Sequence, residues 1–286
     1  MKDFVTTNNL ILDEWRNTYV QQTQSLYPEC KNPGDYFALD GIMNMGEIEP
    51  ERKIFDNGVS GFRWKRIESG KENYLWNNSP LRILYLTKDQ NTNGDVSWDV
   101  RSESLRYPDE KYKDWLDTYN IFFRHLAYSF YGIMKTTAGV PLYYNDIVDA
   151  KVVELLDRQI FARINCKKEV GENKCDNNTL EQVIYDKNYY RFLKQQVLNL
   201  EADLFICCGY SKSIGRTGNH MLNFLNTIGY NFKPVIEEWI YYDEERNKAA
   251  INSYHLSYPG FDYDGMMDAY SKFLQKCHKF DLSHKG

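Results

Sequence analysis

Short apolar runs alternate with helical segments from residue 81 to the end of the chain. Apolar runs bounded by turn residues predict strands, and these are LRILYLT (81–87), IFARINC (160–166), ADLFICCGY (202–210), KPVIEEWIYY (233–242) and KAAINSYHLSY (248–258). Apolar side chains recur every three or four residues in the expected helices, which are 115–135, 183–200, 220–229 and 265–277. The alternation predicts an α/β fold, a three-layer sandwich whose central, mostly parallel, four- to five-stranded sheet is flanked by helices.

Residues 1–80 have a different pattern, in which Gly, Pro, Asn and Lys mix with aromatic residues. We expect an N-terminal extension of helical and irregular chain that packs on the core. NNSP (77–80) is a turn sequence that resets the chain before the first strand. The predicted organisation is therefore the extension, 1–80, followed by an α/β domain, 81–286.

Composition narrows the function classes. The chain has 35 Lys and Arg against 40 Asp and Glu, which gives a formal charge of −5. The composition therefore has no overall basic excess of the kind that indicates a nucleic-acid partner. Its six Cys form no C-x-x-C pair, which argues against a zinc or iron–sulfur centre. No secretory signal pattern opens the sequence, and no run reaches the roughly 18 apolar residues of a membrane span. We expect a reduced, cytoplasmic protein with no membrane partner.

The loops that follow the predicted strands hold most of the candidate chemistry. In a largely parallel sheet, the loops at the carboxyl ends of the strands share one edge, where open α/β folds bind their ligands. Four of these loops begin KDQN (88–91), NCKK (165–168), CGYSK (208–212) and HLSYPG (255–260).

The first loop also resembles a calcium-binding loop. Its acid, amide and glycine positions follow the D-x-[DN]-x-[DN]-G pattern: Asp89, Asn91, Asn93, Gly94 and Asp95. An EF-hand loop needs a bidentate acid at its twelfth position, which here is Val100, and a helix before it, where RILYL predicts a strand. We predict a turn at NTNG and no metal site, and a looser calcium or magnesium loop is left open.

The four loops, in this order, resemble the uracil-DNA glycosylase superfamily over about residues 81–270. The resemblance implies that Asp89 in LYLTKDQN handles the attacking water, with Lys88 just before it, and that Asn165 in FARINCKK reads the base edge. LEADLFICCGYSKS matches the outline of the third strand, which ends in Gly. INSYHLSYPG offers His255 to face the leaving base and Ser257 beside it.

The chain also departs from the family pattern. The first loop lacks the Pro and small residues that usually follow the acid, and Leu256 stands where Pro is usual in the last loop. Lys88 and the pair Lys167–Lys168 are bulky and charged next to the expected pocket. These departures leave the identity of the base open.

Cleavage of an N-glycosidic bond needs these residue types. A carboxylate such as Asp89 stabilises the sugar cation and orients a water, and His255 donates a hydrogen bond to the base as it becomes anionic. The amide of Asn165 both donates and accepts, as base selection requires. Trp98, Tyr210 or Tyr254 would stack on an extruded base. Each polar residue also has a structural alternative: Asp89 as a turn cap, Asn165 bonded to its own backbone, and His255 as a packed core residue.

Basic residues near these loops are candidates for binding phosphate. Segment 161–175 has four basic and two acidic side chains, and 209–220 has two basic and no acidic ones. The expected phosphate- or DNA-binding residues are Lys167, Lys168, Lys212 and Arg216. This charge suits a DNA backbone and a free nucleotide equally.

The resulting prediction is a DNA glycosylase-like hydrolase that removes a uracil-type or modified pyrimidine base without any cofactor. Asp89 and His255 would be catalytic, and Asn165, Lys88 and Ser257 would bind the base. The partner would be DNA or a nucleotide with a target pyrimidine, and the oligomeric state is left open. The alternatives are a non-catalytic nucleotide or nucleic-acid binding protein on the same fold, and a hydrolase of free nucleosides or nucleotides.

Overall fold

A mixed sheet forms the centre of the computed structural model, which describes residues 1–54, 60–90, 96–106, 116, 120–171, 175–212 and 218–283. Its seven strands run in the order β1-β5-β4-β6-β9-β8-β7. Their bounds are Gly41–Ile42 (β1), Ile83–Thr87 (β4), Ala162–Asn165 (β5), Leu204–Cys208 (β6), Lys233–Ile236 (β7), Ile240–Asp243 (β8) and Lys248–Ser253 (β9). The four central strands, β5, β4, β6 and β9, are parallel, while β1 at one edge and β8 and β7 at the other pair antiparallel.

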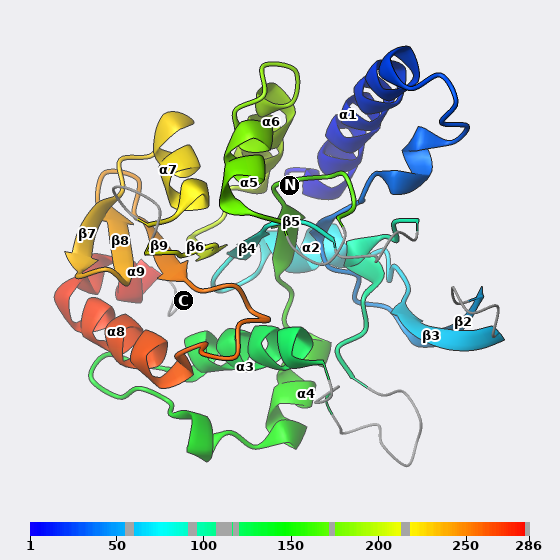
Figure 1. The fold of residues 1–286 in the computed structure, drawn as a ribbon. Coiled ribbons are helices and arrows are strands. Elements are labelled where there is room, and N and C mark those ends of the chain that lie inside the picture. Colours follow the sequence, from blue (N-terminus) through cyan, green and yellow to red (C-terminus); the bar gives the residue numbers. More distant parts are fainter. Residues whose placement is uncertain are drawn as a thin grey trace.

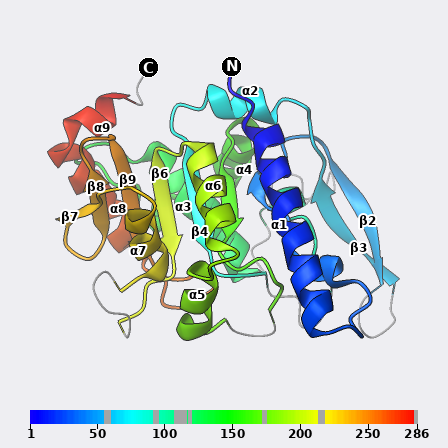
Figure 2. The same ribbon diagram turned by 90° about the horizontal axis from the view of Figure 1, so that it is seen from above.

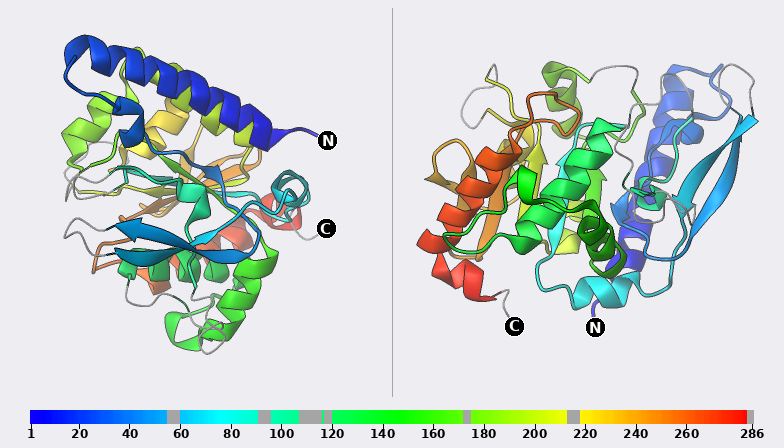
Figure 3. Two further views of the ribbon diagram at one scale, coloured as in Figure 1. Left: turned by 90° about the vertical axis from the view of Figure 1, so that its right-hand side faces the viewer. Right: turned by 90° about the horizontal axis from the view of Figure 1, so that it is seen from below.

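Helices cover both faces of this sheet (Figure 1). One layer contains α1 (Phe4–Leu26), α5 (Asn177–Ile184), α6 (Tyr190–Leu200) and α7 (His220–Thr227), and in Figure 2 this layer lies in front of the sheet. The other contains α3 (Ile121–Lys135), α4 (Asp149–Arg158) and α8 (Tyr263–Lys276), with the short α9 (His278–Ser283) after it (Figure 3, right). The α/β class and the helix–sheet–helix layering are therefore confirmed.

Alternating side chains along the strands explain the two layers, because successive strand residues point to opposite faces. In β4, Leu84 and Leu86 are buried on the α1–α6 side, while Ile83 and Tyr85 are buried on the α3–α8 side. Such strands read as continuous apolar runs, as parallel strands covered on both faces do.

The sheet is larger than the predicted four to five strands. KPVIEEWIYY was expected to be one strand, but it forms the hairpin β7–β8, which turns at Glu238 in the left-handed conformation (φ 60°). At the other edge, β1 comes from the expected extension and pairs with β5. The expected helix 183–200 is likewise interrupted between α5 and α6.

Residues 1–80 contribute to both the helical layer and the sheet. Trp15 of α1 stacks on Phe192 of α6, with ring centroids 5.8 Å apart. A separate antiparallel hairpin of β2 (Ile48–Ile54) and β3 (Ser60–Arg66) extends from the side of the molecule, and α2 (Glu72–Asn77) leads into β4 (Figure 3, left). That 81–286 forms a unit of its own stays a prediction.

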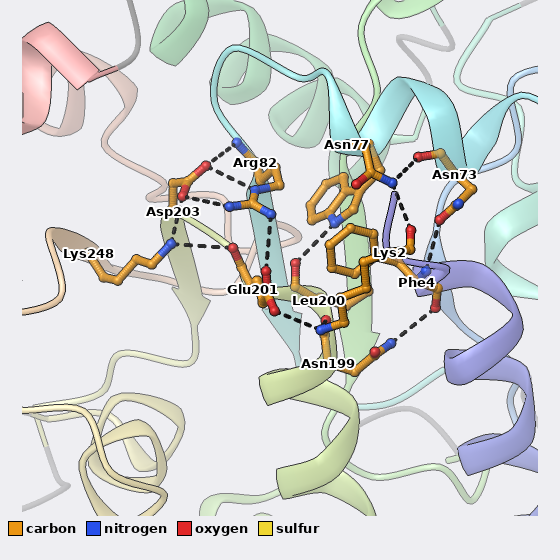
Figure 4. Close-up of polar contacts among 11 residues, drawn as sticks. Lys2, Phe4, Asn73, Asn77, Arg82, Asn199, Leu200, Glu201, Asp203 and Lys248 are labelled. Carbon is orange, nitrogen blue, oxygen red and sulfur yellow. Dashed lines mark hydrogen bonds and ion pairs between the residues drawn. The ribbon is translucent and has the colours of Figure 1, made fainter.

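An ion-pair network ties the start of the chain to the amino-terminal edge of the sheet (Figure 4). Lys2 Nζ lies 2.8 Å from Glu201 Oε1, and Lys248 Nζ lies 2.7 Å from Asp203 Oδ1. Arg82 pairs with both carboxylates. Burial opposes the ionisation of Asp203, yet the charges of Lys248 and Arg82 hold its pKa below the ordinary value. Three cations, Lys2, Arg82 and Lys248, thus share the two carboxylates of Glu201 and Asp203 at this edge.

None of the helices in the described part of the chain is both long and apolar enough to cross a membrane.

Candidate site at the carboxyl edge of the sheet

The carboxyl ends of the four parallel strands lie side by side at the edge opposite the ion-pair network. Thr87 is in register with Asn165 on β5, and Cys208 with Ser253 on β9. From β4 the chain passes beneath the sheet to β5, and from β6 it passes above the sheet towards β9 (Figure 1). The order reverses between β4 and β6, and ligands of open α/β sheets bind at such a point. We call the loops at this edge the rim.

Asn165 is the last residue of β5, and it is fully buried. Its main-chain N–H donates to Asp40 Oδ2 at 2.8 Å, and its Oδ1 accepts a hydrogen bond from the Thr87 hydroxyl at 2.6 Å. The amide nitrogen Nδ2 is also buried, but it has no hydrogen-bond partner among the described residues. Because buried polar groups are nearly always paired, this unpaired donor is where a ligand would complete the pairing.

Arg163, two residues earlier on β5, points to the same face as Asn165. It is buried and forms a charge pair with Glu103, which also accepts a hydrogen bond from the Trp98 indole at 2.8 Å. Its guanidinium lies over the ring of Phe122, 4.5 Å from the centroid. A buried cation is thus held at the base of the rim between a carboxylate and an aromatic face.

Lys168 points into the protein and not towards solvent. Its Nζ lies 2.6 and 2.5 Å from the two oxygens of Asp40, and both side chains are almost completely buried. Asp40 also accepts from Gln196 Nε2 at 2.7 Å, and its carbonyl accepts from Asn8. Lys168, predicted to bind phosphate, is therefore buried with its ammonium paired to Asp40 and does not face solvent.

Asp89 lies two residues beyond β4 with its carboxylate largely covered. Lys167 Nζ is 3.7 Å from its Oδ2, and the two side chains are 11% and 10% exposed. Gly171 packs against the same carboxylate, so closely that a Cβ at this position would overlap it. Burial raises the pKa of Asp89, although the charges of Lys167 and Lys88 oppose the shift. Lys167, predicted to bind phosphate, instead faces Asp89.

Lys88 directly precedes Asp89 at the rim. Its Nζ donates to the Cys175 carbonyl at 3.3 Å and to Asn177 Oδ1 at 3.0 Å. In the described part of the chain, no carboxylate oxygen lies within 4.0 Å of this ammonium. Its charge lowers the pKa of His255 and opposes the raised pKa of Asp89, so Lys88 lies within electrostatic reach of both.

His255 follows β9, and its ring lies 5.8 Å from that of Phe122. The main-chain N–H of Ser257 points at Nδ1 from 3.3 Å, and the Ser257 hydroxyl is 2.7 Å from the same nitrogen. Since Nδ1 accepts, the proton of the neutral ring is on Nε2. Burial, with the nearby charges of Lys88 and Arg163, lowers the pKa of His255 to about 4. At neutral pH His255 is therefore an uncharged donor.

Aromatic rings continue the rim beyond His255. Tyr210 and Tyr254 meet edge to face at 5.0 Å, and Tyr254 stacks on Tyr258 at the same centroid distance. Tyr258 is 48% exposed. Of the stacking candidates predicted from the sequence, Tyr210 and Tyr254 thus belong to one cluster, whereas Trp98 is bound to Glu103.

The predicted residues divide into groups. Asn165 ends one central parallel strand, and Asp89 and His255 follow two others at the same edge, but no hydrogen bond or ion pair joins the three side chains within the described ranges. Lys212 is exposed in the loop after β6. Arg216 and positions 91–95 of the calcium-like loop lie outside the described residues. In the residues that can be described, no three His, Cys, Asp or Glu side chains form a metal-binding group.

Sequence reasoning missed Arg163, Glu103 and Asp40. A signal was present for the first: IFARINC places an arginine inside an apolar run, and arginine is rarely buried without a partner. Glu103 and Asp40 are 60 and 125 residues from their partners on β5, so nothing local indicated them.

Comparisons with protein-family models, curated proteins and solved structures returned no match for this chain.

Proposed function

We propose that the rim binds a pyrimidine base and that the protein hydrolyses its N-glycosidic bond, as a DNA glycosylase-like hydrolase. The observation that carries this proposal is the buried, unpaired amide nitrogen of Asn165 at the end of a central strand. A base edge presents in-plane oxygens and nitrogens to such a donor, and a buried polar group that must be paired is a strong selector. The resemblance of the strand-end loops to uracil-DNA glycosylases supports the same reaction.

His255 has the properties of a donor to the departing base. Its Nε2 carries the proton, and the lowered pKa keeps the ring neutral at physiological pH. A fixed neutral donor stabilises charge that appears on the base oxygen in the transition state, without requiring a proton to be supplied first.

Asp89 supplies the carboxylate for the sugar. In the structure this carboxylate faces the ammonium of Lys167. When substrate binds, Asp89 must therefore either leave Lys167 or contact Lys167 and the sugar together. Its role would be to stabilise the positive charge on the sugar and to orient a water.

Exposed groups beside the rim favour a nucleic-acid strand over a free nucleoside. Lys212 is exposed after β6, and Tyr258 presents an open ring after β9. Single-stranded nucleic acid binds to proteins through such combinations of cations and stacking rings.

The test uses a single-stranded oligonucleotide with one deoxyuridine. After incubation and heating in alkali, the wild-type protein should leave a strand break at that position. Asp89→Asn keeps the shape but loses the charge, so it should slow base release by roughly 100-fold or more while binding survives. Asp268→Asn, which changes an exposed carboxylate on α8, is the matched control and should cleave as wild type. Equal rates for wild type and Asp89→Asn would remove Asp89 from the chemistry.

A second candidate is supported by the Lys167–Asp89 pair. If this pair persists with ligand bound, the carboxylate is not available, and the rim is a non-catalytic binding site for a nucleotide or nucleic acid. Binding of the deoxyuridine oligonucleotide with no strand break would favour this candidate.

A further inference from the structure

We infer that His125, a residue of α3, is a positioning residue for His255, and that it acts through the single peptide group that joins Leu256 to Ser257. His125 holds this peptide in one direction, and the peptide decides which ring nitrogen of His255 carries the proton. The inference rests on the proposed function for the use that it gives to His255, whereas the contacts themselves do not depend on hydrolysis.

The first contact joins α3 to the carbonyl side of this peptide. His125 Nδ1 lies 2.6 Å from the main-chain oxygen of Leu256, and the histidine is buried. Burial lowers the pKa of His125, although the hydrogen bond to Leu256 opposes the shift, and the charge of Arg124 adds to it. The ring is therefore neutral at physiological pH. Because a carbonyl oxygen can only accept, the proton of this neutral ring is on Nδ1.

The second contact starts from the other side of the same peptide. The Ser257 main-chain N–H donates to His255 Nδ1 at 3.3 Å. The Ser257 hydroxyl lies 2.7 Å from the same nitrogen, but a hydroxyl can donate or accept and does not decide the tautomer by itself. A main-chain N–H can only donate. It requires a lone pair on Nδ1 and so places the proton of His255 on Nε2.

The geometry of the peptide links the two contacts. A peptide group is planar, so the directions of its C=O and its N–H are fixed relative to each other. The Leu256 side chain is fully buried, but a peptide can rotate between two residues that stay in place. The hydrogen bond from His125 opposes this rotation, because a rotated peptide would lose both contacts together.

The ring of His125 also contacts the far end of the same loop. It stacks on Phe261, with centroids 4.6 Å apart and ring planes 20° apart. The loop between β9 and α8 runs alongside α3 in Figure 1. His125 thus contributes a hydrogen bond and a stacking surface, and substitutions can separate the two.

The consequence concerns the group that would face the departing base. With its proton on Nε2, His255 donates a hydrogen bond to an oxygen that becomes negative. With the proton on Nδ1, Nε2 would present a lone pair to that oxygen and oppose the reaction. His125 should therefore affect the rate of the chemical step and leave substrate binding almost unchanged.

Nitrogen-15 NMR of the histidine rings at neutral pH tests the tautomers directly. In wild type, His125 should carry its proton on Nδ1 and His255 on Nε2, with the two rings assigned by the loss of their signals in His125→Phe and His255→Gln. His125→Phe keeps the stacking ring without the donor, so His255 should become a mixture of both tautomers. His125→Asn has an amide NH2 group near the place of Nδ1 and should keep the wild-type tautomer of His255. His278→Asn, at an exposed position at the start of α9, is the control and should change nothing.

Kinetics on the deoxyuridine oligonucleotide give the second readout. His125→Phe should lower kcat roughly tenfold while KM stays within about twofold of wild type, and His125→Asn should recover most of the rate. A His125→Phe protein that is folded by circular dichroism and keeps His255 wholly in the Nε2–H tautomer would overturn the inference.

The wild-type spectra decide independently of whether His125→Phe folds, because a proton on Nε2 of His125, or on Nδ1 of His255, would also overturn the inference. The expected tautomers in all variants, with no strand break from any of them, would leave the role of His125 standing and refute hydrolysis instead.

Discussion

Replacement of Asp40 by Asn should be among the most destabilising conservative changes in this protein. Asp40 and Lys168 are 0% and 3% exposed and lie in direct contact, so Asp40→Asn leaves a buried ammonium without its counter-charge. Removal of one partner from a buried ion pair costs about 3–5 kcal/mol. We expect a loss in this range because the new amide has one acceptor oxygen, whereas the carboxylate accepts from Lys168, Gln196 and the Asn165 main chain.

A double-mutant cycle isolates the charge effect. Lys168→Met alone leaves Asp40 with the Gln196 and Asn165 donors, and Asp40→Asn with Lys168→Met removes both charges at similar volume. The double variant should be more stable than Asp40→Asn alone by roughly 2 kcal/mol, since no unpaired charge is left in the core. Glu154→Gln, which breaks an exposed pair with Arg158, is the control and should cost less than about 0.5 kcal/mol.

Urea unfolding followed by circular dichroism and tryptophan fluorescence provides the measurement. Lys168 Nζ lies 5.0 Å from the centroid of the Trp15 ring, so fluorescence reports on the same region. Burial lowers the pKa of Lys168, and Asp40 opposes that shift. Without Asp40 the folded pKa falls further below that of the unfolded chain, so the unfolded state binds more protons. The loss in free energy of unfolding caused by Asp40→Asn should therefore become smaller as the pH rises towards 10. A small loss that does not change with pH would refute the reasoning.

Two further predictions concern the rim. His255, with a folded pKa of about 4 against an ordinary 6.5, contributes stability that is complete above pH 6.5 and is lost as the pH falls towards 4. His255→Gln should therefore lose less stability over that interval, by roughly 1–3 kcal/mol for a partly exposed ring; equal acid sensitivity by urea unfolding would contradict this. Gly171→Ala places a methyl group where the Asp89 carboxylate lies. It should slow base release at least about tenfold by turning Asp89 aside, and a wild-type rate in the alkali assay would show that Asp89 adapts.

The strands of the central sheet could be predicted because their signal is local. LRILYLT and ADLFICCGY are apolar on both faces, as buried parallel strands are, and both form strands. The division of KPVIEEWIYY into two strands was not predictable in the same way. The turn between them has Glu238 in a left-handed conformation, which glutamate rarely adopts. The two-residue strand β1 owes its existence to pairing with β5, more than 100 residues later.

The places of the candidate residues in the fold were predictable from the sequence, whereas the orientations of two lysine side chains were not. Asp89, Asn165 and His255 could be placed at one edge because parallel strands bring their carboxyl ends together. Lys167 and Lys168 were expected to bind phosphate, yet both side chains are largely buried against carboxylates. Their acidic partners, Asp89 and Asp40, come from distant parts of the chain, so only the fold reveals the pairing.

The charges at the rim bear on the choice between catalysis and simple binding. Three of its cations are matched with carboxylates: Arg163 with Glu103, Lys168 with Asp40, and Lys167 with Asp89. Lys88 differs from these three cations. Its ammonium donates to two neutral oxygens among the described residues, the Cys175 carbonyl and Asn177 Oδ1.

Its unmatched charge already acts on His255, the group that would face the departing base. An anion that forms on the base would gain from Lys88 through a medium of reduced dielectric, while a neutral bound base would gain little. An interaction that is stronger in the transition state than in the bound state accelerates reaction and does not merely tighten binding. Under the proposed function, Lys88 would therefore stabilise the transition state more than the bound base, whereas a passive binder at this rim should prefer an anionic ligand.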